Sequence, residues 1–349
     1  MARTKSKEVN KFKGDLLDKY LIPTDIYPLD FILKGGIRTS EMYQFVAESG
    51  LGKTTIALQI AGKLCSEDSK VIYVDSESSI NRDLLKSTGV YSDYEEGNFI
   101  YVRESVFSKL EQKLDDLLSN DDLEVRLIVI DSIATLIPDT FTNFENGTSI
   151  TTKDTNAGSR QLTLFLNKYK ALSIQKKFSI IVINQYRNDI DMRKGAVLKI
   201  FGPKNVVYNS DTIIQIKKNN KCYEFGDIVN KLDNMTDLVF EVVKSNRNSP
   251  KEYIPFCLVY GKGISTYATY LYAMLKLNII TQTGAWYKIP IDGQEFVAHG
   301  ISELFLKFIN RGSNIVTPEI FERIDSYYNE NFRSLSIFDR MWCSMAYLN

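Results

Sequence analysis

Apolar residues follow two different periods along this chain, and the alternation between the two predicts its fold class. Short apolar runs indicate buried strands at Tyr43–Val46, Val71–Val74, Leu127–Ile130 and Ser179–Ile183. Apolar residues at helical spacing mark the segments Lys53–Cys65, Phe107–Leu118 and Ser159–Ile174. Strands that alternate with helices predict an α/β fold, in which helices cover both faces of a mostly parallel sheet.

The pattern changes after residue 200. Strand-like runs that follow one another without helices lie at Thr212–Ile216, Leu238–Val243 and Phe256–Tyr260. They predict strands added at one edge of the sheet, with antiparallel pairing. After Gly263 the sequence predicts a helix over 264–277, a short hairpin strand over 284–288, and helices near 301–311 and 317–330.

These patterns divide the chain into three parts. Residues 1–33 form an N-terminal segment that opens with one amphipathic helix. The apolar residues of that helix are Val9, Phe12, Leu16 and Leu17. Residues 34–263 form the α/β core, and residues 264–349 form a small α/β lobe.

Composition excludes some classes of protein. Lys plus Arg (43) equals Asp plus Glu (43), which argues against binding nucleic acid by bulk charge and leaves binding through a local patch. The cysteines Cys65, Cys222, Cys257 and Cys343 lie far apart and His299 is the single histidine, which argues against a zinc site or His-based catalysis. We expect a reducing, cytosolic compartment, no signal peptide and no membrane span.

A phosphate-binding loop is predicted between the first core strand and the first core helix. Backbone N–H groups of such a loop surround phosphate oxygens, and Gly50 and Gly52 let the backbone approach them. Lys53 would reach the β- and γ-phosphates, and Thr54 would offer its hydroxyl to Mg²⁺. Ala47 stands where glycine is usual. The residues predicted to bind nucleotide here are Ala47, Glu48, Ser49, Gly50, Leu51, Gly52, Lys53, Thr54 and Thr55.

Acidic residues follow two of the other predicted strands. Asp131 ends the apolar run Leu127–Ile130, where a P-loop protein places the acid of the Mg²⁺ shell; alone, it could also begin an ordinary turn. Glu77 lies just past the strand Val71–Val74 and is our candidate for polarising the attacking water, with Asp75 as a rival.

These pieces resemble the RecA family over nearly the whole chain. Asp75-Ser-Glu77 is similar to the family's Asp-x-Glu, and Val129–Ala134 to its Walker B strand. Ile183-Asn-Gln185 resembles the strand end that carries a glutamine sensing the γ-phosphate. Gly284-Ala-Trp-Tyr287 is the most discriminating match, because general P-loop ATPases and replicative helicases do not share it. Val207–Thr212 is closer to phage recombinases of the UvsX type, which favours a phage-encoded member in the host cytoplasm.

The resemblance implies further site residues. Lys53, Glu77 and Gln185 would act in catalysis, and Lys244 would reach across a subunit interface to the neighbour's phosphates. Arg247 is a candidate for a second such cation, with a basic turn at a strand edge as the alternative. Leu84 stands where the family often has a tyrosine that stacks on adenine, so the base contact would either be weaker or come from Asn81. The last nine residues, 341–349, include no acid, so we expect no regulation by the acidic C-terminal tail that is common in the family.

Two long connections, 138–156 and 186–201, stand where the family places its DNA-binding loops. Arg160 would contact phosphate at the start of the helix after the first loop, and Ile190 would separate stacked bases. The second loop mixes cations with apolar residues, which suits a site that follows a single strand. Its predicted DNA-binding residues are Arg187, Ile190, Met192, Arg193, Lys194 and Lys199.

The family resemblance implies a RecA-type P-loop ATPase that uses ATP and Mg²⁺ for DNA strand exchange. It would bind single-stranded and homologous double-stranded DNA as a helical homo-oligomer with ATP at subunit interfaces. Single-strand-binding and loader proteins would be further partners. The alternatives are a ring-forming helicase and a non-catalytic paralogue or loader.

Replacing Lys53 by Ala should abolish ATP turnover, because the loop loses the cation that neutralises phosphate charge. Phosphate release in the presence of single-stranded DNA measures this. Turnover that survives the replacement would contradict the assignment of the phosphate site.

Overall fold

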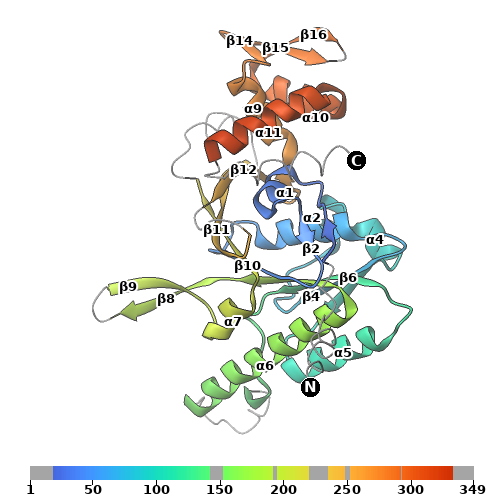
Figure 1. The fold of residues 1–349 in the computed structure, drawn as a ribbon, viewed down its shortest axis with the longest axis vertical. Helices are drawn as coiled ribbons and strands as arrows, with labels where there is room; N and C mark the ends of the chain where they lie inside the picture. The colour runs from blue at the N-terminus through green and yellow to red at the C-terminus, as the bar shows by residue number, and fades with distance from the viewer. Residues whose placement is uncertain are drawn as a thin grey trace, which may run out of the picture.

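The computed structural model describes residues 19–141, 152–191, 195–219, 235–247, 252–291 and 293–332. Within these residues nine strands form one sheet, which crosses the middle of the molecule (Figure 1). In spatial order they are β13 (Gly263–Ser265), β12 (Tyr253–Val259), β11 (Met235–Ser245), β10 (Thr212–Lys218), β3 (Met42–Ala47), β7 (Ser179–Asn184), β6 (Val125–Asp131), β4 (Lys70–Asp75) and β5 (Phe99–Arg103).

Six neighbouring strands of this sheet, from β10 to β5, run parallel, which confirms the predicted fold class. The added strands β11, β12 and β13 pair antiparallel, as expected. The prediction was wrong for β10, which runs parallel to β3. The helix α7 (Lys204–Asn209) precedes β10, and by returning the chain across one face it lets β10 run in the direction of β3.

Helices cover both faces of the sheet. One face packs on α1 (Tyr27–Leu33) and α2 (Lys53–Leu64), and the other on α5 (Phe107–Ser119) and α6 (Thr152–Lys176), as Figure 1 shows. Every residue of β3 is buried, because a parallel strand between two helical layers has no solvent-facing side.

The C-terminal lobe packs on the core through α1. Tyr27 places its ring 5.3 Å from that of Tyr270 and 5.6 Å from that of Phe321, and its hydroxyl donates to Oδ1 of Asp325 at 3.1 Å. The expected short hairpin is a three-stranded sheet. The lobe contains α9 (Thr266–Lys276), β14 (Thr281–Thr283), β15 (Trp286–Ile291), β16 (Gln294–His299), α10 (Gly300–Ile315) and α11 (Pro318–Phe332).

Shorter elements complete the described chain. They are β1 (Leu21–Ile22), β2 (Ile37–Arg38), α3 (Arg82–Ser87), α4 (Tyr91–Glu95), η2 (Asp139–Phe141), β8 (Tyr186–Asp191) and β9 (Gly195–Ile200). The helix predicted within residues 1–20 lies outside the described residues apart from its end, and the division at 33 and 263 stays a prediction. None of the helices in the described ranges is long and apolar enough to cross a bilayer.

Two neighbouring residues of α6 should differ sharply in their effect on stability. Phe165 is fully buried against the rings of Phe107 and Tyr169, whereas Leu164 is 58% exposed. Phe165→Ala should lower the free energy of unfolding by about 3–5 kcal/mol, because it leaves a cavity. Leu164→Ala should change it by about 0.5 kcal/mol or less. Urea denaturation measures both, and equal losses would contradict the assignment of the buried face.

Candidate functional site

The predicted phosphate loop connects the end of β3 to the start of α2. Gly50 and Gly52 have positive φ angles of 78° and 75°, which favour glycine. A Cβ on Gly52 would lie 2.3 Å from Cδ2 of Leu258, so β12 also restricts this position. Ala47 is fully buried at the strand end, where its small side chain fits the core.

Lys53 folds back over this loop. Its Nζ donates to the backbone oxygens of Ala47 and Glu48 at 3.0 and 2.7 Å. Burial lowers the pKa of Lys53, while the charges of Asp131, Glu77 and Glu48 raise it. The ammonium therefore lies at the mouth of the loop among acceptors, where a phosphate oxygen could replace the carbonyls.

Asp131 and Thr54 meet beside the loop. Thr54 donates its hydroxyl proton to Oδ2 of Asp131 at 2.7 Å, and Tyr73 donates to the same oxygen at 2.8 Å. Burial raises the pKa of Asp131 to about 6, although these two hydrogen bonds lower it. A hydroxyl and a carboxylate side by side are oxygen donors of the kind that Mg²⁺ prefers. The sequence analysis identified Thr54 and Asp131 but missed Tyr73.

The two acids after β4 have different environments. Asp75 is buried and accepts hydrogen bonds from Ser79 N, Ile80 N and the Tyr101 hydroxyl, so it holds the turn that follows the strand. Glu77 is exposed on that turn, and its Oε1 accepts a hydrogen bond from Ser132 at 2.7 Å. This geometry favours Glu77 over its rival as the residue that could contact water, and the role itself stays a prediction.

The side chain of Asn81 caps a helix. Its side-chain oxygen accepts a hydrogen bond from Leu84 N at 2.9 Å and so caps α3. Leu84 is partly buried and packs against the core next to α2. A contact between Asn81 and a nucleobase stays a prediction.

Gln185 connects the strand ends beside the phosphate loop to the second predicted DNA-binding segment. It follows β7, whose last residue, Asn184, is paired with Val46 beside the phosphate loop. The carbonyl of Gln185 accepts from Phe201 N at 3.0 Å, and Asn184 Nδ2 donates to Phe201 O at 2.9 Å. These bonds close the base of the segment 186–201.

Within the segment 186–201, β8 and β9 pair as a two-stranded ribbon rather than the expected loop, and this ribbon projects from the core (Figure 1). Arg187 pairs with Lys199 across the ribbon, and both are exposed. The guanidinium of Arg187 lies 4.0 Å from the ring centroid of Phe201. The backbone of Ile190 belongs to β8, while its side chain lies outside the described part. Also outside it are Met192, Arg193 and Lys194.

The first predicted DNA-binding segment, 138–156, is described at its ends. Helix α6 begins at Thr152, seven residues before the predicted start at Ser159. Arg160 is therefore exposed in the third turn of the helix rather than at its opening. Residues 142–151 lie outside the described residues.

Lys244 and Arg247 lie towards the strand ends opposite to the ends that carry the phosphate loop. Lys244 pairs with Ile213, which pairs with Gln44 near the start of β3, whereas the loop leaves the end of β3. Lys244 Nζ donates to the backbone oxygens at the end of α7, and burial lowers its pKa. Those oxygens belong to Val207, Tyr208 and Ser210, at 2.8, 3.2 and 2.6 Å.

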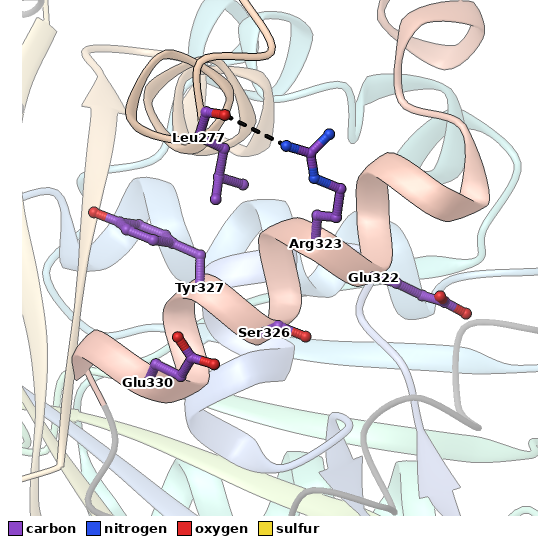
Figure 2. Close-up of a pocket in the computed structure, with 6 residues that line it drawn as sticks. All are labelled: Leu277, Glu322, Arg323, Ser326, Tyr327 and Glu330. Atoms are coloured by element: carbon purple, nitrogen blue, oxygen red, sulfur yellow. Dashed lines mark hydrogen bonds between the residues drawn. The ribbon is translucent and has the colours of Figure 1, made fainter.

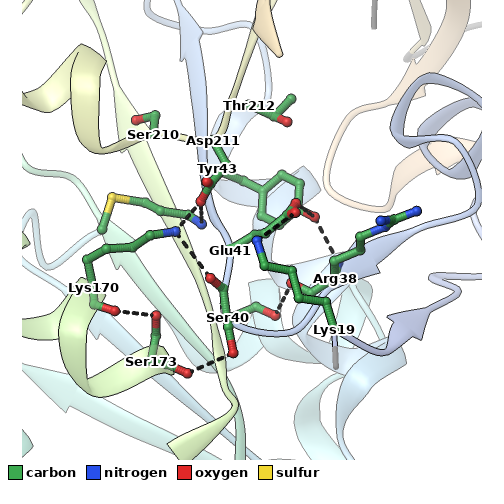
Figure 3. Close-up of polar contacts among 12 residues, drawn as sticks. Lys19, Arg38, Ser40, Glu41, Tyr43, Lys170, Ser173, Ser210, Asp211 and Thr212 are labelled. Carbon is green, nitrogen blue, oxygen red and sulfur yellow. Dashed lines mark hydrogen bonds and ion pairs between the residues drawn. The ribbon is translucent and has the colours of Figure 1, made fainter. Parts of the chain in front are cut away.

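Arg247 is bound within its own chain. Its guanidinium donates to Leu33 O at 2.7 Å, to Glu41 Oε2 at 3.1 Å and to the Tyr43 hydroxyl at 2.9 Å. Figure 3 shows two of these partners, Glu41 and Tyr43, together with Lys19, whose Nζ lies 3.2 Å from Glu41 Oε1. Neither Arg247 nor Lys244 could reach the phosphate loop of its own subunit, so their predicted role requires a neighbour.

A surface pocket of the C-terminal lobe lies apart from these groups (Figure 2). Arg323 crosses it and donates to Leu277 O at 3.4 Å. Its lining residues are Leu277, Glu322, Arg323, Ser326, Tyr327 and Glu330. None of them belongs to the phosphate loop or its acids, so this pocket is not the candidate nucleotide site. The described residues also contain no group of three metal-ligating side chains from His, Cys, Asp and Glu.

The fold and the phosphate loop define a P-loop ATPase core with a projecting ribbon and a C-terminal lobe. Residues 20–265 match the family model described as the RecA N-terminal domain, so the chain belongs to the RecA family of DNA-dependent ATPases and recombinases. It is similar to Protein RecA of Aquifex aeolicus, with 24% identity over 310 residues that cover 88% of this chain and 83% of the relative.

Two further relatives have the same printed name. Protein RecA of Fusobacterium nucleatum is 26% identical over 270 residues, which cover 76% of this chain and 67% of that protein. Protein RecA of Francisella tularensis subsp. novicida is 27% identical over 270 residues, covering 76% and 70%. The family generally uses ATP with Mg²⁺, and the glycine loop, Lys53, Thr54 and Asp131 fit that pair chemically.

Asp131 should make the stability of the nucleotide-free protein depend on pH. Its folded-state pKa of about 6 exceeds the ordinary value of 3.8, so the folded protein binds more protons than the unfolded chain between pH 4 and 6. The free energy of unfolding should therefore fall by about 2–3 kcal/mol as the pH rises through this window. Asp131→Asn should remove that fall. Urea denaturation from pH 4 to 7.5 compares the two proteins, and identical pH profiles would contradict the assignment.

Proposed function

We propose that this protein is an ATP-dependent DNA strand-exchange recombinase that assembles as a helical filament on single-stranded DNA. In this proposal ATP and Mg²⁺ bind at the phosphate loop with Lys53, Thr54 and Asp131. Glu77 orients the attacking water, and Lys244 and Arg247 contact the phosphates of a neighbouring subunit. The filament then pairs its strand with homologous duplex DNA.

The observation that carries the proposal is the position of Gln185. It stands between β7, which is paired with the strand of the phosphate loop, and the ribbon, whose base it closes through Phe201. A hydrogen bond from its side chain to a γ-phosphate would bias the orientation of the ribbon. Hydrolysis would remove that bond and release the DNA.

The charge of the ribbon supports a polyanionic ligand. Arg187 and Lys199 are paired across the strands and both are exposed, so they place two cations side by side on one face of the ribbon. Phosphates of a nucleic acid strand could contact both. The contact between the exposed Arg187 guanidinium and the half-buried Phe201 ring is also of the kind on which a nucleobase can lie.

Nucleotide and DNA should raise each other's affinity, since a coupling between two sites is reciprocal. We expect wild-type protein to bind a fluorescent single-stranded oligonucleotide roughly 5–150-fold more tightly with a non-hydrolysable ATP analogue than with ADP. Gln185→Ala should abolish this difference, and Gln282→Ala, an exposed glutamine of the lobe, should keep it. Fluorescence anisotropy at fixed salt measures all three proteins.

Two results would contradict the proposed function. One is a wild-type affinity for oligonucleotide that is the same with either nucleotide. The other is a closed ring in electron micrographs of the protein with ATP analogue and single-stranded DNA, which would favour the helicase.

A further inference from the structure

Tyr73 is a buried tyrosine in the middle of β4 with a polar partner in the candidate ATP site. Its side chain has no exposed surface, and its ring centroid lies 5.6 Å from that of Phe99. Its hydroxyl donates to Oδ2 of Asp131 at 2.8 Å. A phenylalanine would fill nearly the same apolar volume, so packing alone does not account for the hydroxyl.

The register of the sheet sets this contact. Asp75 of β4 is paired with Asp131 of β6, and Tyr73 precedes Asp75 by two residues. Residues two apart on a strand point to the same face, and an aromatic side chain reaches the diagonal neighbour on the next strand. The contact therefore comes from the most regular part of the fold rather than from a loop.

Asp131 receives its two hydrogen bonds from different kinds of element. Thr54 belongs to the first turn of α2, directly after the phosphate loop, and its hydroxyl would also meet Mg²⁺. Tyr73 belongs to the sheet interior and has no access to solvent. Its hydrogen bond can therefore persist with or without nucleotide and restrict rotation of the carboxylate.

We propose that Tyr73 is a positioning residue, whose hydroxyl holds the Asp131 carboxylate in the orientation that receives the Mg²⁺ shell. Tyr73 itself touches neither metal nor nucleotide. The inference rests on the proposed function, in which Asp131 serves Mg²⁺ beside the phosphates. Groups that orient a metal ligand from behind set metal affinity, and their loss weakens it roughly 10–100-fold.

Tyr73→Phe tests the inference because it removes one oxygen and keeps the ring. We expect the Mg²⁺ concentration at half-maximal binding of a fluorescent ATP analogue to rise by about tenfold. The midpoint for ATP hydrolysis should rise in parallel, while the rate at saturating Mg²⁺ is retained, since lost affinity is overcome by concentration. Thermal melting without nucleotide reports whether the variant is folded.

Tyr169→Phe is the matched control. Tyr169 is also buried and donates to a carboxylate, Asp115 Oδ1 at 3.1 Å, but it lies in α6 on the other face of the sheet. It should keep the wild-type Mg²⁺ midpoint.

The outcomes separate this inference from the proposed function. An unchanged midpoint in Tyr73→Phe, or an equal shift in both variants, would overturn the role of Tyr73 and leave the ATPase proposal standing. A wild-type protein whose nucleotide binding ignores Mg²⁺ would overturn both.

Discussion

Parallel hydrogen bonding of β3 with β7, and of β4 with β6, is the constraint on which the candidate site depends. It brings the carboxyl ends of four strands to one edge of the sheet, with Val46 paired to Asn184 and Asp75 to Asp131. Each strand end then contributes a different group: the phosphate loop, Gln185 with the ribbon, Asp131 as the predicted Mg²⁺ acid, and the exposed Glu77. Because all four strands are buried between helical layers, the spacing of these groups is rigid.

Polar side chains at these strand ends fall into two groups, one buried and one more exposed. Asp75 and Asn184 are buried and bind backbone groups beyond the strand end. Asp75 accepts from Ser79 N and Ile80 N, and Asn184 donates to Phe201 O at the base of the ribbon. Glu77 and Gln185 stand one or two residues further on and are more exposed. Each buried residue, Asp75 or Asn184, thus fixes the segment that carries its more exposed neighbour, Glu77 or Gln185. These hydrogen bonds explain how short polar segments can hold a defined geometry outside the sheet.

Much of this arrangement could be predicted from local sequence. The buried strands and the helices α2 and α5 have strong periodic patterns, and the loop motif located Lys53 and Thr54. The features that the sequence did not predict depend on the pairing of strands. The direction of β10 and the strand β5 are set by neighbours distant in sequence, and the ribbon 186–201 forms through contacts between its own two halves.

Side-chain partners were harder to predict than elements. The sequence pattern identifies Tyr73 only as part of an apolar run, because an isolated sequence does not show which strand lies beside another. The alternation of Tyr73 and Asp75 on one face was available as a signal, but its meaning required the β4–β6 register. Arg247 shows the same limit, since its partners Leu33 and Glu41 are more than 200 residues away.

The two ends of the parallel strands carry different chemical groups, and this difference bears on the proposed assembly. Lys244 is aligned through Ile213 with Gln44, three residues before the end of β3, so at about 3.3 Å per residue its backbone lies about 10 Å along the strand direction from the strand end that opens the phosphate loop. Its Nζ donates to carbonyls that precede β10, on the side away from that loop. In the proposed filament, the phosphate that Lys244 contacts would belong to a second copy, whose phosphate loop would face the Lys244 side of the first copy. Such a head-to-tail contact uses two different surfaces and generates a helix when its rotation does not close. In the free subunit Lys244 is bound to carbonyls of its own chain, so a neighbour's phosphate has to compete with them, and this competition would make hydrolysis depend on assembly.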